Sequence, residues 1–204
     1  MLSYQTVESH TLELLKKLMA EPSLTGTRLV GGTSLALQYG HRNSIDLDFF
    51  GTIDDDPLSI RECLETIGHV SVLKETKSIR IYDLDKVKID FVDYSRYQWL
   101  TEAITEDGLR LASHKDIAAM KVNAIEGRGT RKYFVDIYFL LQHYSLDEIL
   151  GFYQEKYPEN SVFRALMSLS YFEDAEKQMM PKMFSKVSWD EMKAYIIKEV
   201  EKIK

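Results

Sequence analysis

The sequence predicts an α+β fold, in which a mixed β-sheet core with flanking helices precedes a helical C-terminal part. Residues 45–50 alternate between apolar and polar side chains, as a strand with one buried face does. Three more strand-like runs follow between residues 70 and 91, and after residue 113 the apolar residues recur at helical spacing. Because no flexible linker is visible, we expect residues 1–112 and 113–204 to share a core.

The composition is that of a soluble globular protein, and it excludes several classes. The 204 residues are 45% apolar and 28% charged, so a disordered chain is not expected. The net charge of −6 argues against bulk coating of nucleic acid. The single cysteine, Cys63, fits a reducing compartment. The longest run without polar residues, 137–141, is far too short to span a membrane, and the N-terminus lacks a secretion signal. We therefore expect a cytoplasmic protein without a membrane partner.

The first part of the chain is expected to mix short helices and strands. Pro57 suits the first turn of a helix, and the segment 83–85 suits the turn of a hairpin. The expected elements are an amphipathic helix over 3–20, a strand at 29–30, a helix over 34–39 capped by Thr33 and closed by Gly40, a strand over 45–50, a helix over 57–67, and strands over 70–73, 78–82 and 87–91.

The second part is expected to be helical. Ser113 and Asp116 have the spacing of a capping box, with aspartate in place of the usual glutamate. The expected elements are a helix from Ser113 to about Glu126, an interruption at Gly127 and Gly129, a helix over 130–144, and a largely helical remainder with breaks near Pro158 and Pro181.

Two carboxylates stand out on the strand at 45–50. Asp46 and Asp48 are expected on one face, about 6.5–7 Å apart at Cα, with Ile45, Leu47 and Phe49 on the other face in the core. Like charges this close are unfavourable unless a cation lies between them. Hard oxygen ligands of this kind suit Mg²⁺ or Mn²⁺.

A third carboxylate, Asp90, lies on the polar face of the strand at 87–91. If the two strands are adjacent, three carboxylates meet, and such a set around two divalent ions suits in-line attack on a phosphate. The alternative is an ordinary polar strand face. The acids at 54–56 precede Pro57 and are better explained as a helix N-terminus than as metal ligands.

A glycine turn precedes the carboxylates. Gly31, Gly32, Thr33 and Ser34 lie between a strand and a helix, where backbone N–H groups and hydroxyls can bind a phosphate. A plain strand–helix turn is the alternative. Arg42 and Ser44 could also contact phosphate oxygens, although Arg42 could equally be a surface arginine.

A lysine interrupts the apolar stripe of the helix at 113–126. Lys121 falls among Ile117, Met120, Ala124 and Ile125, and Arg128 continues the stripe. Lys121 either extends to water or reaches a cleft that holds an anion, for which triphosphate is the natural candidate.

A second charged residue, Asp136, lies in an apolar helical run and needs a partner, either Lys132 or Lys121. Arg128, Arg131 and Lys132 form a local basic cluster, which could receive a nucleic-acid backbone or be a solvated turn.

These segments together resemble the AbiEii/AbiGii toxins, a family within the DNA polymerase β-like nucleotidyltransferases. The match covers roughly residues 25–185. The segments that carry it are 31–37 (GGTSLAL), 42–50 (RNSIDLDFF), 116–121 (DIAAMK), 128–132 (RGTRK), 134–138 (FVDIY) and 171–176 (YFEDAE). Tyr133 departs from the family, since many relatives have an acid there.

The resemblance implies a nucleotidyltransferase core over 1–112 and a helical part over 113–204 that contributes site residues. It implies transfer of a nucleoside monophosphate from a nucleoside triphosphate to the 3′ end of tRNA, and a cognate antitoxin. By this resemblance Asp46 and Asp48 bind metal, Asp90 matches a third carboxylate, and Gly32, Thr33 and Ser34 lie near phosphate. Ser44 supplies a site hydroxyl, Lys121 binds triphosphate, and Asp136 is the last site acid.

Two alternatives stay open. In the first alternative the chemistry is the same, but the acceptor is a small hydroxylated molecule such as an aminoglycoside, or a protein. The acidic net charge suits such acceptors somewhat better than tRNA. In the second alternative the protein is a non-catalytic binding module, and the joint presence of Asp46, Asp48, Asp90 and Lys121 argues against it.

Overall fold

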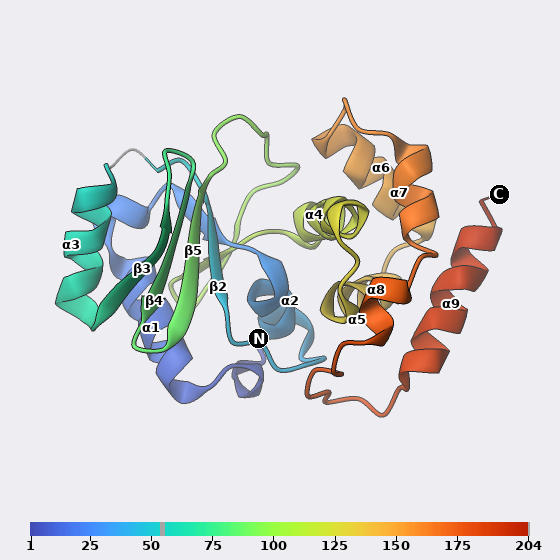
Figure 1. Cartoon of the computed structure of the whole chain (residues 1–204), viewed down its shortest axis with the longest axis horizontal. Coiled ribbons are helices and arrows are strands. Elements are labelled where there is room, and N and C mark those ends of the chain that lie inside the picture. Colours follow the sequence, from blue (N-terminus) through green and yellow to red (C-terminus); the bar gives the residue numbers. More distant parts are fainter. Residues whose placement is uncertain (54–55, 204) are drawn as a thin grey trace. The chain divides into compact units, whose positions relative to one another are not determined.

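The chain divides into two compact units, which are described here in turn (Figure 1). A computed structural model describes residues 1–53 and 56–203. The sheet unit comprises Met1–Gly40, Ser44–Gln98 and Ala103–Ala112, and the helical unit comprises His41–Asn43, Trp99–Glu102 and Ser113–Lys204. Two short segments from the first 112 residues thus belong to the helical unit.

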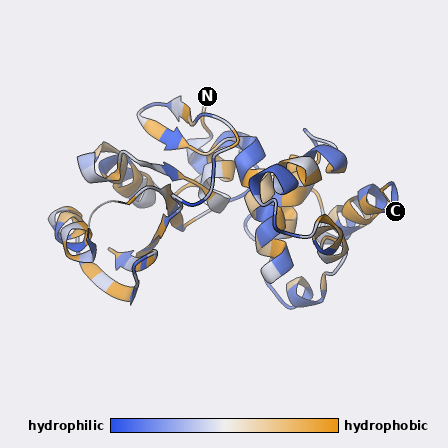
Figure 2. Cartoon of the chain, turned by 90° about the horizontal axis from the view of Figure 1, so that it is seen from above, coloured by the Kyte–Doolittle hydropathy of each residue, from blue (hydrophilic) through white to orange (hydrophobic). Residues whose placement is uncertain are grey.

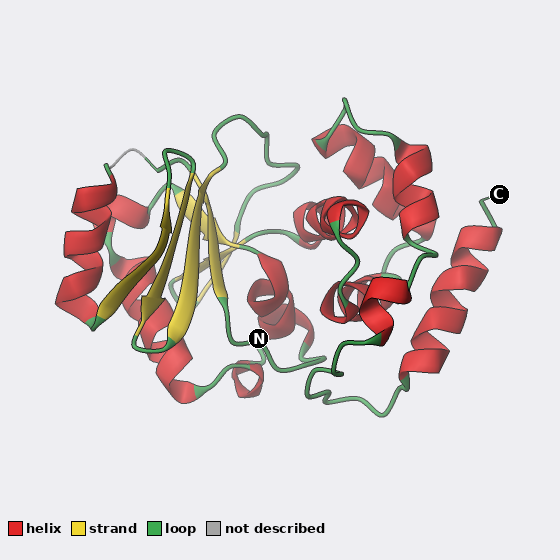
Figure 3. Cartoon of the chain, viewed as in Figure 1, coloured by secondary structure: helices red, strands yellow, loops and turns green. Residues whose placement is uncertain are grey.

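The sheet unit is built on a seven-stranded mixed sheet, drawn in yellow in Figure 3. The strand order is β3-β4-β5-β2-β1-β7-β6, with parallel pairing between β2 and β5 and between β1 and β7. The strands are β1 Thr27–Leu29, β2 Leu47–Gly51, β3 Val70–Glu75, β4 Ile79–Leu84, β5 Val87–Asp93, β6 Ile104–Glu106 and β7 Leu109–Leu111.

One face of this sheet carries the core. Along β2 and β5 buried residues alternate with partly exposed ones, so each strand has a buried face and an open face. Phe49 of β2 and Phe91 of β5 are fully buried and stack with their ring centroids 5.3 Å apart. Helices α1 (Ser9–Ala20) and α3 (Pro57–Ile67) cover this face (Figure 1) and contribute leucines to the same core.

Most expected strands and turns of this unit are confirmed. The strands at 70–73, 78–82 and 87–91 are present and slightly longer, and α3 has the expected bounds. Asp85 and Lys86, with φ of +50° and +69°, form the two-residue turn of the β4–β5 hairpin. The Asp56 carboxylate accepts a hydrogen bond from the Ser59 N–H, which confirms it as a helix cap. Asp54 and Asp55 lie outside the described residues.

Other expectations were wrong at the ends of elements. The helix expected over 3–20 begins at Ser9, and a short 3-10 turn spans Tyr4–Thr6. Helix α2 spans Gly31–Tyr39, so Thr33 lies inside it and does not cap it, whereas Gly40 closes it at φ +69° as expected. Strands β6 and β7 were not predicted, because three residues are too few to show a period.

The helical unit consists of helices joined by short loops and one longer segment before the last helix. Figure 2 shows hydrophobic and hydrophilic residues alternating along these helices, as expected where one side is buried. Ser113 caps the first helix by accepting from the Asp116 N–H. The helices are α4 His114–Gly127, α5 Arg131–Leu140, α6 Leu146–Lys156, α7 Val162–Ser168, α8 Glu173–Glu176 and α9 Trp189–Glu201. No helix within residues 1–53 and 56–203 is long and apolar enough to cross a membrane.

Specific bonds fix the two inserted segments within the helical unit. The Leu100 N–H donates to Asp116, whose carboxylate also pairs with the fully buried Lys156 at 2.7 Å. The Asn43 N–H donates to the Lys182 carbonyl, and the Phe184 N–H donates to the His41 carbonyl. Residues 41–43 are thereby fixed within this unit, with His41 and Arg42 buried.

Candidate active site

The carboxylates of the sheet unit lie on the open face of strands β2 and β5. These strands are parallel, and Asp48 pairs with Asp90 in register, so the expected adjacency of the two strands is confirmed. Neighbouring strands lie about 4.8 Å apart, so the two aspartates are close neighbours. Both are partly exposed, whereas Leu47 and Ile89 on the opposite face are fully buried.

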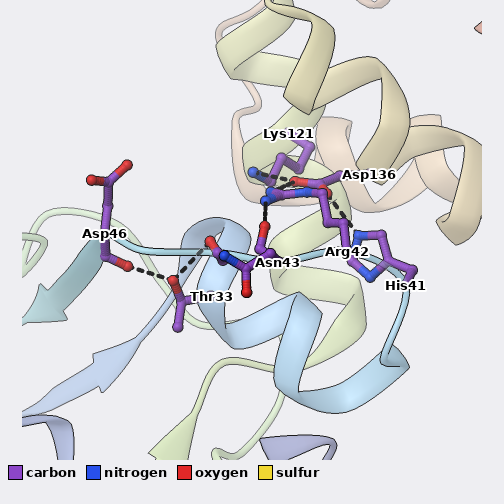
Figure 4. Close-up of polar contacts among 8 residues, drawn as sticks. Thr33, His41, Arg42, Asn43, Asp46, Lys121 and Asp136 are labelled. Carbon is purple, nitrogen blue, oxygen red and sulfur yellow. Dashed lines mark hydrogen bonds and ion pairs between the residues drawn. The ribbon is translucent and has the colours of Figure 1, made fainter. Parts of the chain in front are cut away.

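Asp46 immediately precedes β2 and does not lie within it. The loop around it is held by two bonds: the Ser44 N–H donates to the Thr6 carbonyl, and the Thr33 hydroxyl donates to the Asp46 carbonyl. Figure 4 shows the Asp46 carbonyl toward Thr33 and its carboxylate directed away. Ile45 was expected in the core but is 50% exposed, because the strand alternation begins only at Leu47.

A lysine that the sequence analysis overlooked accompanies these acids. Lys88 lies two residues before Asp90 on the same face, and its Nζ donates to both Asp90 oxygens at 2.5 and 2.6 Å. Burial lowers the pKa of Lys88. The bond to Asp90 and the charges of Asp90, Asp48 and Asp46 raise it by more than burial lowers it, so the pKa of Lys88 is raised overall. The signal was present in the sequence, since side chains at i and i+2 of a strand share a face.

The open face offers hard oxygen donors that suit a divalent ion. Asp46 and Asp48 supply two carboxylates, and Asp48 Oδ2 packs so closely against Gly31 that a β-carbon there would overlap it. Residues 1–53 and 56–203 contain no group of three or more His, Cys, Asp or Glu side chains that could together hold a metal ion. Asp90 is instead engaged by Lys88, and its role as a metal ligand stays a prediction.

The glycine turn places helix α2 directly after β1. Gly31 adopts φ +68°, a left-handed conformation that favours glycine. The Thr33 hydroxyl also contacts the Ser44 hydroxyl at 2.9 Å, which ties the turn to the loop before β2. Ser34 is fully buried, and its hydroxyl accepts from Gln38 within the helix.

A second polar cluster lies in the helical unit around Asp136 (Figure 4). Asp136 is fully buried on α5. Its Oδ1 accepts from Arg42 Nε at 2.7 Å and contacts His41 Nε2 at 2.9 Å. Its Oδ2 accepts from Arg42 Nη2 at 2.9 Å and pairs with Lys121 Nζ at 2.7 Å. Each carboxylate oxygen therefore has two partners.

Electrostatics keep the Asp136 carboxylate ionised. Burial alone would raise the pKa of Asp136, but the charges of Arg42 and Lys121 hold it well below its usual range. Burial lowers the pKa of His41, which favours the neutral imidazole. Two cations then surround one anion, and the cluster carries a net positive charge.

This cluster identifies the partner of Asp136 and excludes one alternative each for Lys121 and Arg42. Asp136 pairs with Lys121 from the preceding helix, together with Arg42 and His41, which the sequence did not suggest as partners. Lys121 is 5% exposed and does not extend to water; its Nζ also lies 4.7 Å from the Tyr133 ring centroid. Arg42 is 2% exposed and is not a surface arginine. Since its oxygens are taken up by these partners, Asp136 positions Lys121 and Arg42.

The predicted basic cluster is partly dispersed. Arg128 is exposed at the end of α4 and does not continue the buried stripe. Arg131 turns to α8, where its guanidinium donates to the carbonyls of Ala175 and Glu176 at 3.0 and 2.7 Å. Lys132 is exposed. Two exposed cations, Arg128 and Lys132, are thus available to solvent.

The mixed sheet, with neighbouring strands that carry paired aspartates beside a glycine turn, is similar in fold to solved proteins. The fold is similar to MenT4, a nucleotidyltransferase toxin of Mycobacterium tuberculosis (TM-score 0.56, 13% identity, 93% of this chain and 81% of that one). It is also similar to the antibiotic-resistance factor ANT(2″)-Ia (TM-score 0.55, 13% identity, 72% of this chain and 91% of that one).

The sequence comparisons give the family. Residues 13–202 match the family described as nucleotidyl transferase AbiEii toxin, type IV toxin–antitoxin system. The uncharacterized protein aq_aa25 of Aquifex aeolicus is 33% identical over 196 residues, which is 93% of each chain. The chain belongs to the AbiEii nucleotidyltransferase toxin family, which confirms the resemblance and the enzyme class.

The Asp136 cluster predicts a pH-dependent loss of stability in Asp136→Asn. At neutral pH the variant leaves Arg42 and Lys121 buried without their counter-charge, which costs about 3–5 kcal/mol in the free energy of unfolding. Because the folded pKa of Asp136 is depressed, this stability is present above the unfolded pKa of about 3.9 and is lost as the pH falls below it.

Urea unfolding of both proteins between pH 3 and pH 7 measures this difference. The control Asp190→Asn alters an exposed ion pair and should change the free energy by less than about 1 kcal/mol. A difference for Asp136→Asn that does not change with pH would contradict the assignment.

Proposed function

We propose that this protein is a metal-dependent toxin that transfers a nucleoside monophosphate from a nucleoside triphosphate to the 3′ end of tRNA in the cytoplasm. The observation that carries the proposal is the register of β2 and β5, which sets Asp48 beside Asp90 with Asp46 immediately before the strand. The family description, a toxin of type IV toxin–antitoxin systems, supports the toxic role and an antitoxin partner.

In this proposal the acceptor hydroxyl attacks the α-phosphate in line, a bond to that phosphorus forms, and pyrophosphate leaves. Mg²⁺ or Mn²⁺, when bound by Asp46 and Asp48, neutralises charge on the phosphates. The first N–H groups of α2, at Gly31, Gly32 and Thr33, are suited to bind phosphate oxygens, with the Ser44 hydroxyl beside them.

The cationic cluster of the helical unit has a separate role in the proposal. Lys121 binds the triphosphate, and the net positive charge that it shares with Arg42 favours an anion. Asp136 orients both cations and does not itself contact substrate, since its oxygens are already bonded within the cluster. Ser34, buried and bonded to Gln38, is not assigned a phosphate contact.

A second acceptor class is favoured by the charge distribution. The chain is acidic overall, and Arg131 is bound to backbone carbonyls, so its helical unit offers a modest basic surface at Arg128 and Lys132. ANT(2″)-Ia, an antibiotic-resistance factor of similar fold, supports a small hydroxylated acceptor such as an aminoglycoside. A protein acceptor is the third case. Membership of a nucleotidyltransferase family speaks against the non-catalytic binding module.

Replacing Asp48 should abolish the transfer. Wild-type protein incubated with tRNA, Mg²⁺ and each α-labelled nucleoside triphosphate should label the 3′ end of tRNA, and Asp48→Asn should reduce the rate at least about 100-fold, since a metal ligand is lost. Chelation of the metal by EDTA should have the same effect. The measurement is label retained on tRNA after gel separation.

The matched control is Asp93→Asn, which changes an acid at the end of β5 bonded to the Ser95 N–H and should keep activity. If wild-type protein labels no RNA but labels an aminoglycoside or a protein, the acceptor assignment is wrong. If it labels nothing at all, the transfer itself is contradicted.

Neutralising the exposed basic pair should distinguish the acceptors. Arg128→Ala/Lys132→Ala should raise the KM for tRNA at least about fivefold and reduce the slope of log affinity against log salt by about 2, since each phosphate contact contributes about one unit. A small acceptor should be modified at an unchanged rate. Lys186→Ala/Lys198→Ala removes two other exposed lysines of the same unit and serves as the control. Equal KM values for tRNA in both double variants would contradict the hypothesis that Arg128 and Lys132 contact tRNA.

A further inference from the structure

An ammonium group already occupies the third carboxylate of the open sheet face. Lys88 Nζ donates to both oxygens of Asp90, so it holds this carboxylate from the side on which both oxygens point. Lys88 and Asp90 lie on one strand and one face, and Asp48 is the register partner of Asp90 on the neighbouring strand. The charges of Asp48 and Asp46 also act on this ammonium.

Lys88 limits what can bind at Asp90. Its Nζ donates to both Asp90 oxygens, so a divalent ion at this carboxylate would have to share it with an ammonium and would meet its repulsion. The metal site of the proposed function, at Asp46 and Asp48, does not involve this carboxylate.

We propose that Lys88 serves as a built-in cation in the place of a second metal ion, so that the sheet unit binds one divalent ion through Asp46 and Asp48. The proposal rests on the proposed function only in taking the open carboxylate face as the metal site. In this arrangement Asp90 is a positioning residue that holds Lys88, and the count of bound ions is set by the side chain at position 88.

Lys88 is well suited to testing, because its side chain is 43% exposed and its removal leaves the core intact. The probe is Mn²⁺ alone, titrated into the full chain, with free Mn²⁺ counted by electron paramagnetic resonance. Wild-type protein should bind one ion per chain. Lys88→Met should bind two, since Asp90 is released, and Lys88→Arg should bind one, since the charge is kept.

Two further variants make the count specific. Lys88→Met/Asp90→Asn should return to one ion, because the released carboxylate is removed. Lys86→Met replaces the exposed lysine in the turn of the same hairpin and should bind one ion, as the wild type does. Circular dichroism of each variant confirms that the fold is retained.

Equal ion counts in wild type and Lys88→Met, whether none, one or two, overturn the proposal. A count of two for Lys88→Met that persists in Lys88→Met/Asp90→Asn also overturns it. These outcomes are independent of the transfer assay: a protein that labels no acceptor but shows the one-to-two change refutes the proposed function and leaves the role of Lys88 standing.

Discussion

The parallel pairing of β2 with β5 is the constraint on which the site depends. It brings Asp48 and Asp90 from segments far apart in the sequence to neighbouring positions on one face. Two adjacent carboxylates repel each other unless cations lie near them, so this strand pairing is favourable only with positive charge nearby. In the structure Lys88 supplies such a positive charge to Asp90.

Asp136 represents the opposite solution in the helical unit. Here one buried carboxylate collects two cations and a histidine, and it is satisfied entirely by protein groups. A buried ion pair of this kind contributes little net stability, but removal of one member is costly because a charge is left without a partner. The cluster therefore fixes the position of Lys121 more than it adds to the free energy of folding.

The fold does not identify the acceptor molecule. Proteins of similar fold include a nucleotidyltransferase toxin and an antibiotic-resistance factor, so the fold by itself does not identify the molecule that is modified. Of the basic cluster that the sequence predicts, Arg128 is exposed, whereas the guanidinium of Arg131 is bound to two backbone carbonyls.

The sequence by itself determined the α+β class, the family and most strands, because local periodicity and motif spacing report which side chains share a face. It misplaced Ile45 and Thr33, because element ends depend on bonds such as that from Thr33 to the Asp46 carbonyl. Only the tertiary structure joined Arg42 and His41 to Asp136, across more than 90 residues of sequence. Such partners are chosen by long-range packing, for which a single sequence carries no local signal.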